Sequence, residues 1–280
     1  MTKLNSASNR EPALLITPGL IFLTMAFFFP ALNMLSLSVV HPTTDSLTLE
    51  HYAKFFSDGY YASVAFRTIR LSVLITATCV LIGFPLALII SRSPGWVRSL
   101  LIMLVILPLM TSVVIRTFGW LVILGPGGLL SWLLQSTGLS DKQISLMHTE
   151  SGIVIAMVQV LLPFQVLTVL GSLNRIGSEL EEASRVMGAG FFQTIRSVIL
   201  PLAIPGIVSG SLLVFALSIS SFITPSLVGG VRLPVMAGSI YQQVTGSFDW
   251  GFAAALSVML LGATLALVLP YMVLSRSGRH

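Results

Sequence analysis

Six long stretches without a charged residue constrain the fold of this chain more than any other feature. They cover residues 12–40, 71–91, 99–115, 151–174, 197–231 and 250–275. Each is near or above the roughly 20 residues that cross a bilayer as a helix. Of the 280 residues, 55% are hydrophobic and only 9% are charged, whereas a soluble domain carries about 25% charged residues. The sequence therefore predicts a membrane protein and excludes a soluble enzyme or a nucleic-acid-binding protein.

All six stretches are predicted to be helices. They are continuous and rich in Leu, Ile and Val, whereas the strands of a membrane barrel alternate apolar and polar side chains over about ten residues. A backbone in lipid must also satisfy its own hydrogen bonds, which favours helices. We expect an all-α membrane protein with six transmembrane helices and a single transmembrane domain over residues 1–280. The first stretch is too long for a signal-peptide core, so we expect it to be a retained span.

Basic residues in the connections predict the orientation. Connections rich in Lys and Arg stay in the cytoplasm. One set of connections, with both termini, holds nine basic residues: Lys3, Arg10, Arg92, Arg98, Arg175, Arg185, Arg196, Arg276 and Arg279. The opposite set holds five: Lys54, Arg67, Arg70, Lys142 and Arg232. Both termini are therefore expected in the cytoplasm, together with the loop at about residues 175–200.

That cytoplasmic loop has a readable local pattern. Ser178 followed by Glu181 is a capping box, which predicts the start of a helix. Gly188 and Gly190 predict the end of that helix and a reversal of the chain. A second short helix is expected from Phe191, so the loop should fold as a helix, a glycine turn and a helix.

The loop resembles the EAA loop of the membrane subunits of bacterial ABC importers, in which Glu-Ala-Ala is followed at fixed spacing by Gly, Ile and Leu-Pro. The matching positions here are Glu182, Ala183, Ser184, Gly188, Val198, Leu200 and Pro201. Ser184 and Val198 depart conservatively from the Ala and Ile of the family. The resemblance implies a coupling helix that docks on an ATPase subunit, and we include Ala189, Gly190 and Phe191 in this coupling loop. The alternative is an interfacial hairpin without a partner.

Four further segments resemble the spermidine/putrescine branch of these permeases: residues 116–121, 124–129, 222–230 and 249–253. The resemblance implies the type I ABC importer permease fold and a multi-pass subunit in the bacterial inner membrane. It implies four kinds of partner: a second permease, which we expect to form a heterodimer with this chain, two ATPase subunits, an extracytoplasmic substrate-binding protein and membrane lipid. It also implies import of a small amino compound by alternating access, with a polyamine such as spermidine or putrescine as the first candidate. The same branch includes permeases for opines, aminophosphonates and other zwitterionic solutes.

ATP chemistry is not expected in this chain. None of its lysines, Lys3, Lys54 and Lys142, follows a glycine, so a P-loop phosphate cradle cannot form. None of its histidines, His41, His51, His148 and His280, has the spacing of a zinc site. We therefore predict no enzyme activity, no catalytic residue, no metal site and no cofactor in this chain. ATP and Mg are expected on the partner ATPase.

Polar residues inside the spans are the candidates for a solute pathway, because such residues face protein or water rather than lipid. Arg116 directly follows the charge-free stretch 99–115 and is the one full charge that we place inside a span, and Trp120 follows one turn later. Arg116 has a structural alternative, as a cation on helix carbonyls, and Trp120 has one as an interfacial aromatic residue. The remaining candidates inside the spans carry a hydroxyl or an amide: Gln159, Ser218, Ser221 and Thr224. Asp249 is a further candidate at the outer mouth of the pathway.

Some of these polar groups have alternatives in helix packing. A serine hydroxyl inside a span can bond to a carbonyl of its own helix. Gln165 is a weaker pathway candidate beside Pro163, and Gly206 with Gly210 predicts a close-packed helix face.

A secondary transporter or channel is the rival class, and it should show carboxylates inside the membrane or inverted repeats. Neither is visible in the sequence. The same lack of carboxylates argues against a strongly cationic solute. A zwitterionic or anionic solute that meets Arg116 therefore remains the alternative to a polyamine.

Overall fold

A computed structural model describes residues 10–41, 46–138 and 142–277 of the chain. The chain divides into two compact units, which are described separately. The larger comprises Gly59–Ser239 and Leu260–His280, and the smaller comprises Met1–Asp58 and Ile240–Met259. The elements of the described residues are helical, apart from an isolated bridge between Val40 and Leu47.

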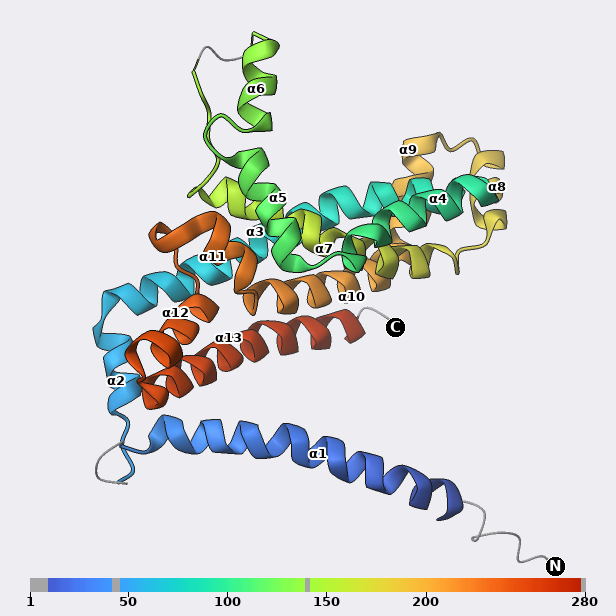
Figure 1. The fold of residues 1–280 in the computed structure, drawn as a ribbon. Coiled ribbons are helices and arrows are strands. Elements are labelled where there is room, and N and C mark those ends of the chain that lie inside the picture. Colours follow the sequence, from blue (N-terminus) through green and yellow to red (C-terminus); the bar gives the residue numbers. More distant parts are fainter. Residues whose placement is uncertain (1–9, 42–45, 139–141, 278–280) are drawn as a thin grey trace, which may run out of the picture. The chain divides into compact units, whose positions relative to one another are not determined.

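Three long helices form the centre of the larger unit: α3 (Gly59–Arg92), α7 (Glu150–Leu173) and α10 (Leu200–Ile219). They pack side by side (Figure 1). One buried cluster joins residues such as Ile75, Met157 and Val214, and a second joins Ile90, Val169 and Ala203. The remaining helices of this unit are α4 (Gly95–Ile106), α5 (Val113–Leu124), α6 (Leu129–Ser136), α8 (Ser178–Val186), α9 (Phe191–Thr194), α11 (Ile223–Gly229), the first residues of α12 (Met236–Gln242) and the end of α13 (Trp250–Ser277) from Leu260 on.

The smaller unit contains α1 (Arg10–Val39), α2 (Glu50–Ser57) and the start of α13 (Trp250–Ser277). Almost the whole described surface of α1 is exposed, with Phe22 and Phe29 more than two-thirds accessible. An apolar helix with so much exposed surface is suited to lipid or to another apolar protein surface. The Tyr52 hydroxyl donates a hydrogen bond of 2.8 Å to the Ser38 hydroxyl and joins α2 to the end of α1.

The described residues contain six helical segments long and apolar enough to cross a membrane. They are Ile16–Val39, Gly59–Arg92, Val113–Ser136, Glu150–Leu173, Phe191–Ile219 and Trp250–Leu269. The predictions of an all-α fold and of six spanning helices are confirmed.

The predicted third span at 99–115 is wrong. Helix α4 ends at Ile106, and a short 3-10 turn over Leu107–Met110 follows. Thr111 is then extended, with φ −97° and ψ 146°, before α5 begins. Pro108 explains the break, because proline has no N–H for an α-helical bond. The spanning segment of this region is instead Val113–Ser136, formed by α5 and α6.

Two other predicted limits also differ from the structure. The second span begins at Gly59, not at residue 71, and so it includes Arg67 and Arg70. The fifth does not run unbroken from 197 to 231, because α10 ends at Ile219 and α11 starts anew at Ile223. A stretch without charged residues identifies apolar sequence, but it does not show where a helix begins, breaks or ends.

Gln165 of α7 contacts both of the other central helices, and its side chain is fully buried. Its Nε2 donates to the carbonyl of Ile207 on α10 at 3.3 Å. A Cβ atom added at Gly83 of α3 would lie 2.9 Å from Gln165 Cγ, and one added at Gly210 of α10 would lie 2.8 Å from Gln165 Oε1. Glycine on both sides thus makes room for one amide, and Gln165 serves helix packing.

We expect Gly83→Ala and Gly210→Ala each to destabilise the permease by about 1–3 kcal/mol, the usual result of overpacking a core. Gln165 is fully buried and lies between the two glycines, so an added methyl group on either side crowds it. The measurement is the thermal aggregation midpoint of the full chain in detergent. Gly171→Ala is the matched control, because nothing lies within 4 Å of the added Cβ; an equal loss in this variant would refute the packing explanation.

Candidate coupling loop and solute pathway

The loop between α7 and α10 is folded. Helix α8 begins at Ser178, and Gly177 occupies the N-cap position with φ −64° and ψ 146°. The predicted cap at Ser178 is therefore wrong by one residue, because the extended backbone that a cap requires falls on Gly177. The side chain of Ser178 lies outside the described part of the structure. Glu179 and Glu181 stand in the first turn, where acidic groups favour a helix start.

Gly188 ends α8 in the left-handed region, with φ +83°. Its N–H donates to Arg185 O at 2.9 Å, and the N–H of Ala189 donates to Ser184 O at 3.1 Å. Gly190 then has φ −73° and ψ 168° and precedes α9. The predicted helix end at Gly188 is confirmed. Gly190 reverses the chain with an extended backbone that other residues also adopt.

The chain re-enters the apolar bundle through a widened helical turn. Pro201 has no N–H to offer to the carbonyl four residues earlier, and its ring crowds that carbonyl. The five residues Ile195–Ile199 accordingly form a π-helical turn, in which the N–H of Leu200 bonds to Ile195 O. The stretch Phe191–Ile219 still forms one segment of spanning length.

The inner side of the loop is held to the rest of the larger unit. The Ser184 and Thr194 hydroxyls lie 3.0 Å apart, and Thr194 and Ile199 are buried. Arg92 at the end of α3 forms an ion pair with Glu181 of α8. These contacts fix α8 and α9 relative to the helices from which the loop emerges.

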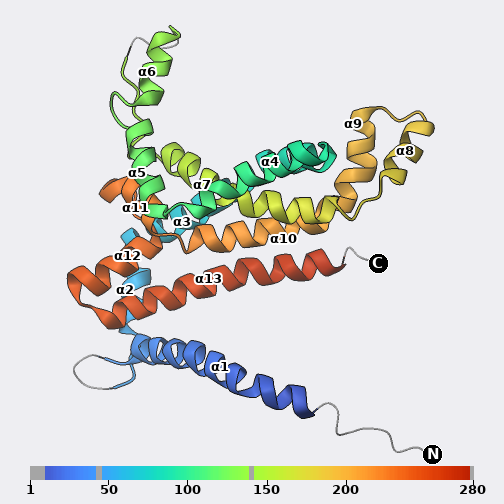
Figure 2. The ribbon, with the colours of Figure 1, turned by 45° about the vertical axis from the view of Figure 1, so that its right-hand side comes forward.

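The outer side of the loop carries an exposed apolar patch, which we call the loop-tip patch. Its four members are large apolar side chains between 67% and 86% exposed: Val186, Met187, Phe191 and Phe192. The two phenylalanine rings meet edge to face, with centroids 5.6 Å apart. Glu182 and Arg185 are exposed on the same helix. Figure 2 shows α8 and α9 projecting beyond the ends of α7 and α10.

Four predicted pathway residues lie where α5, α7 and α11 meet. Trp120 Nε1 donates to Gln159 Oε1 at 3.2 Å. The Thr224 hydroxyl lies 3.0 Å from that of Thr117, and both are buried. The Ser221 hydroxyl lies 3.6 Å from the sulfur of Met157. Thr117 was not predicted, although it stands beside Arg116 in the motif at 116–121.

A cavity of about 580 Å³ lies beside the contact between Trp120 and Gln159. Trp120 and Gln159 contribute to its wall, and most of the other lining side chains are aliphatic residues of α3, α4 and α7. Ser218 on α10 is 5% exposed, and its hydroxyl has no hydrogen-bond partner among the described residues.

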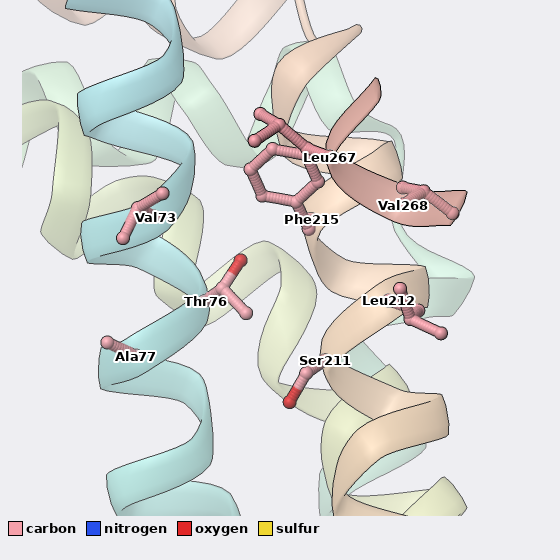
Figure 3. A pocket seen from close by; sticks show the side chains of 8 residues that line it. All are labelled: Val73, Thr76, Ala77, Ser211, Leu212, Phe215, Leu267 and Val268. Atoms are coloured by element: carbon pink, nitrogen blue, oxygen red, sulfur yellow. The ribbon is translucent and has the colours of Figure 1, made fainter. Parts of the chain in front are cut away.

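A second pocket of about 320 Å³ lies between α3, α10 and the end of α13 (Figure 3). Its two hydroxyls, on Thr76 and Ser211, both bond to carbonyls of their own helices at 2.7 Å. This pocket contains none of the predicted pathway residues, so we assign no solute to it.

Arg116 lies in the first turn of α5 and contacts the backbone. Its Nη2 donates to Thr111 O at 3.0 Å, across the break before the helix. This is the structural alternative that the sequence left open. Its Nε and Nη1 are buried and have no partner among the described residues.

Asp249 belongs to the smaller unit, where both its oxygens are engaged. Oδ1 accepts a hydrogen bond of 3.0 Å from the N–H of Phe252 and caps α13. Oδ2 lies 3.4 Å from the Lys54 ammonium group, which also sits 4.1 Å from the centroid of the Phe252 ring. Asp249 is thus partly neutralised before any solute arrives.

One charged cluster was missed by the sequence reasoning. Arg70 on α3 forms an ion pair with Glu150 at the start of α7, and Arg67 Nε lies 3.9 Å from the same carboxylate. Arg67 Nη1 also donates to Pro234 O at 3.3 Å. Arg67 and Arg70 are three residues apart, a spacing that places both on one face of a helix. They were instead counted in the connection before the second span, so their contact with Glu150 was not predicted.

Comparisons with known proteins agree with this architecture. Residues 80–277 match the family of binding-protein-dependent transport system inner membrane components. The chain is 34% identical over 263 residues to the spermidine/putrescine transport system permease protein PotB of Haemophilus influenzae, covering 91% of this chain and 92% of that protein. It is 33% identical over 232 residues to PotB of Escherichia coli, covering 83% of each chain.

A solved structure shows the same fold. It is a bacterial alginate ABC transporter in complex with alginate pentasaccharide-bound periplasmic protein, and its matching chain has a TM-score of 0.82 at 19% identity, with 96% of both chains covered. The chain described here is a multi-span membrane protein with the fold of an ABC importer permease. It belongs to the family of binding-protein-dependent transport system inner membrane components.

Proposed function

We propose that this permease imports a polyamine such as spermidine or putrescine across the bacterial inner membrane. The observation that carries the proposal is the identity of 33–34% over most of the chain to two permeases named for spermidine and putrescine transport. Transport follows alternating access, and this chain supplies one side of the pathway.

We also propose the partners that the importer class requires. These are a second permease, two ATPase subunits that hold ATP and Mg, and an extracytoplasmic substrate-binding protein. The loop-tip patch supports the ATPase contact, because four exposed apolar side chains on a folded loop resemble the apolar centre of a protein interface. Closure of the ATPase dimer moves α8 and α9, and these move the helices to which they are joined.

The orientation is part of the same proposal. The loop-tip patch must face the cytoplasm to meet an ATPase, and the nine-to-five bias of basic residues in the predicted connections supports this orientation. Both termini then lie on the cytoplasmic side.

A polyamine carries several positive charges, so its pathway requires negatively charged groups that this chain alone does not supply. Among the six spanning segments of the described residues, the one carboxylate is Glu150, which contacts Arg67 and Arg70. Asp249 is engaged with Lys54 and with the start of α13. Trp120 offers a ring face that attracts cations, and the aliphatic cavity wall suits the methylene chain of the solute. We propose that the second permease supplies the negative charge.

A zwitterionic or anionic solute, such as an opine or an aminophosphonate, is the second candidate. The buried Nε and Nη1 of Arg116 favour it, because they have no partner among the described residues and an acidic group that reached them would satisfy both.

Uptake by the reconstituted complex distinguishes the two candidates. We expect ATP-dependent uptake of spermidine or putrescine, with less than about a threefold change in Arg116→Gln, since the arginine would then act only on the Thr111 carbonyl. Uptake of 2-aminoethylphosphonate or octopine that falls steeply in Arg116→Gln would overturn the polyamine assignment. Recovery of the intact complex is the control for assembly.

A further inference from the structure

Arg92 and Glu181 form an ion pair between α3 and the coupling loop. Arg92 is the last residue of α3, and Glu181 lies in the first turn of α8. The Glu181 side chain is only 12% exposed and that of Arg92 is 35% exposed. Glu182, the next residue along α8, is exposed. The two neighbouring carboxylates therefore have different surroundings: Glu181 faces α3, and Glu182 faces outward.

The pair joins two parts that the chain does not connect directly. Helix α8 follows α7 after a short turn and leads through α9 into α10, so any movement of α8 reaches those two helices through the backbone. Helix α3 ends far earlier in the sequence, although it packs along both α7 and α10. Its cytoplasmic end contacts α8 through the Arg92 guanidinium.

The positive charge of Arg185 explains why a carboxylate at Glu181 is needed to hold α8 against α3. Arg185 lies one turn after Glu181 on α8, and its positive charge opposes that of Arg92. With Glu181 in place, its carboxylate contacts Arg92 and offsets part of this repulsion. Without it, two like charges would repel and push α8 away from α3.

We propose that the Arg92–Glu181 ion pair is a strut that transmits movement of the coupling loop to α3. The proposal rests on the proposed function, because it requires α8 to be the helix that the ATPase moves. Arg92 and Glu181 are positioning residues: they touch neither solute nor nucleotide, and they set how far α3 follows α8. This ion pair is partly buried, so its two charges are screened by solvent less than those of an exposed pair.

The test is a charge exchange in the reconstituted complex, with spermidine uptake and ATP hydrolysis measured together. Glu181→Arg brings three positive charges together, and we expect uptake per ATP hydrolysed to fall at least about tenfold, within the range of typical coupling between sites. The double variant Arg92→Glu with Glu181→Arg restores opposite charges and should recover that ratio to within about threefold of the wild type. Glu181→Gln, which keeps the shape of the side chain, should show an intermediate loss.

Arg98→Gln is the matched control. It removes one positive charge at the same end of the bundle and breaks a hydrogen bond of 2.8 Å to Asn174 on the turn after α7. We expect its ratio of uptake to hydrolysis to stay within about twofold of the wild type.

Two outcomes would overturn the strut. One is a normal ratio in both Glu181→Arg and Glu181→Gln, and the other is a double variant no better than Glu181→Arg although its complex is fully recovered. If Glu181→Arg fails to assemble, the ratio in Glu181→Gln decides the question. A wild-type chain that neither binds an ATPase nor transports would instead refute the proposed function, so the two failures are distinguishable.

Discussion

Gly188→Val is expected to reduce uptake at least about tenfold while the permease still inserts into the membrane. Gly188 has φ +83°, where a β-branched residue is strained by about 1–3 kcal/mol. No heavy atom lies within 4 Å of an added Cβ, so the effect comes from the backbone and not from crowding. The strain would unwind the end of α8 and displace the loop-tip patch. Uptake in membrane vesicles, normalised to the amount of inserted permease, measures it.

Gly190→Val is the matched control for this prediction. Gly190 lies two residues later and also has open space around it, but its φ of −73° is accessible to every residue. We expect it to retain most of the uptake. Equal activity of the two valine variants would mean that the left-handed turn at Gly188 has no role in coupling.

Phe192→Asp is expected to release the ATPase from the permease. Phe192 is 83% exposed in the loop-tip patch, and a central aromatic residue of an interface commonly contributes about 2–4 kcal/mol to binding. A carboxylate at this position would have to be desolvated against an apolar partner. We therefore expect the amount of ATPase recovered with the tagged permease to fall at least about thirtyfold.

Gln193→Asp provides the comparison for charge alone. Gln193 is exposed and adjacent to the patch without belonging to it. The ATPase should be recovered with this variant at nearly the wild-type amount. Equal losses in both variants would indicate a general effect of negative charge and would remove the patch from the interface.

The fold was largely predictable because lipid imposes a simple rule on sequence. A helix in the bilayer needs about 20 apolar residues, and the charge-free stretches report that length directly. These stretches predict the wrong helix limits where charged residues lie inside a helix or where an uncharged residue breaks one. Arg67 and Arg70 lie inside α3, and both contact the carboxylate of Glu150, which is 80 residues from Arg70 in sequence. The break before α5 depends on Pro108, which carries no charge and is invisible to a charge count.

The candidate site was predictable only where local geometry determines it. Gly188 was found because a helix end requires a backbone that glycine adopts easily. The pairing of Trp120 with Gln159, and of Thr117 with Thr224, depends instead on how α5, α7 and α11 pack together. The spacing of residues within one segment cannot predict a contact between two different helices. The inward turn of Glu181 toward Arg92 was hidden for the same reason.

The most direct test of an ATP-driven importer is ATP hydrolysis by the purified complex of the full chain. After purification from bacterial membranes and reconstitution in liposomes, we expect an ABC ATPase and a second permease in fixed ratio with this chain. Hydrolysis should rise several-fold when the substrate-binding protein and spermidine are added together, and spermidine should accumulate only with ATP. A chain that purifies alone and carries solute down an ion gradient without ATP would be a secondary transporter, and the importer assignment would be wrong.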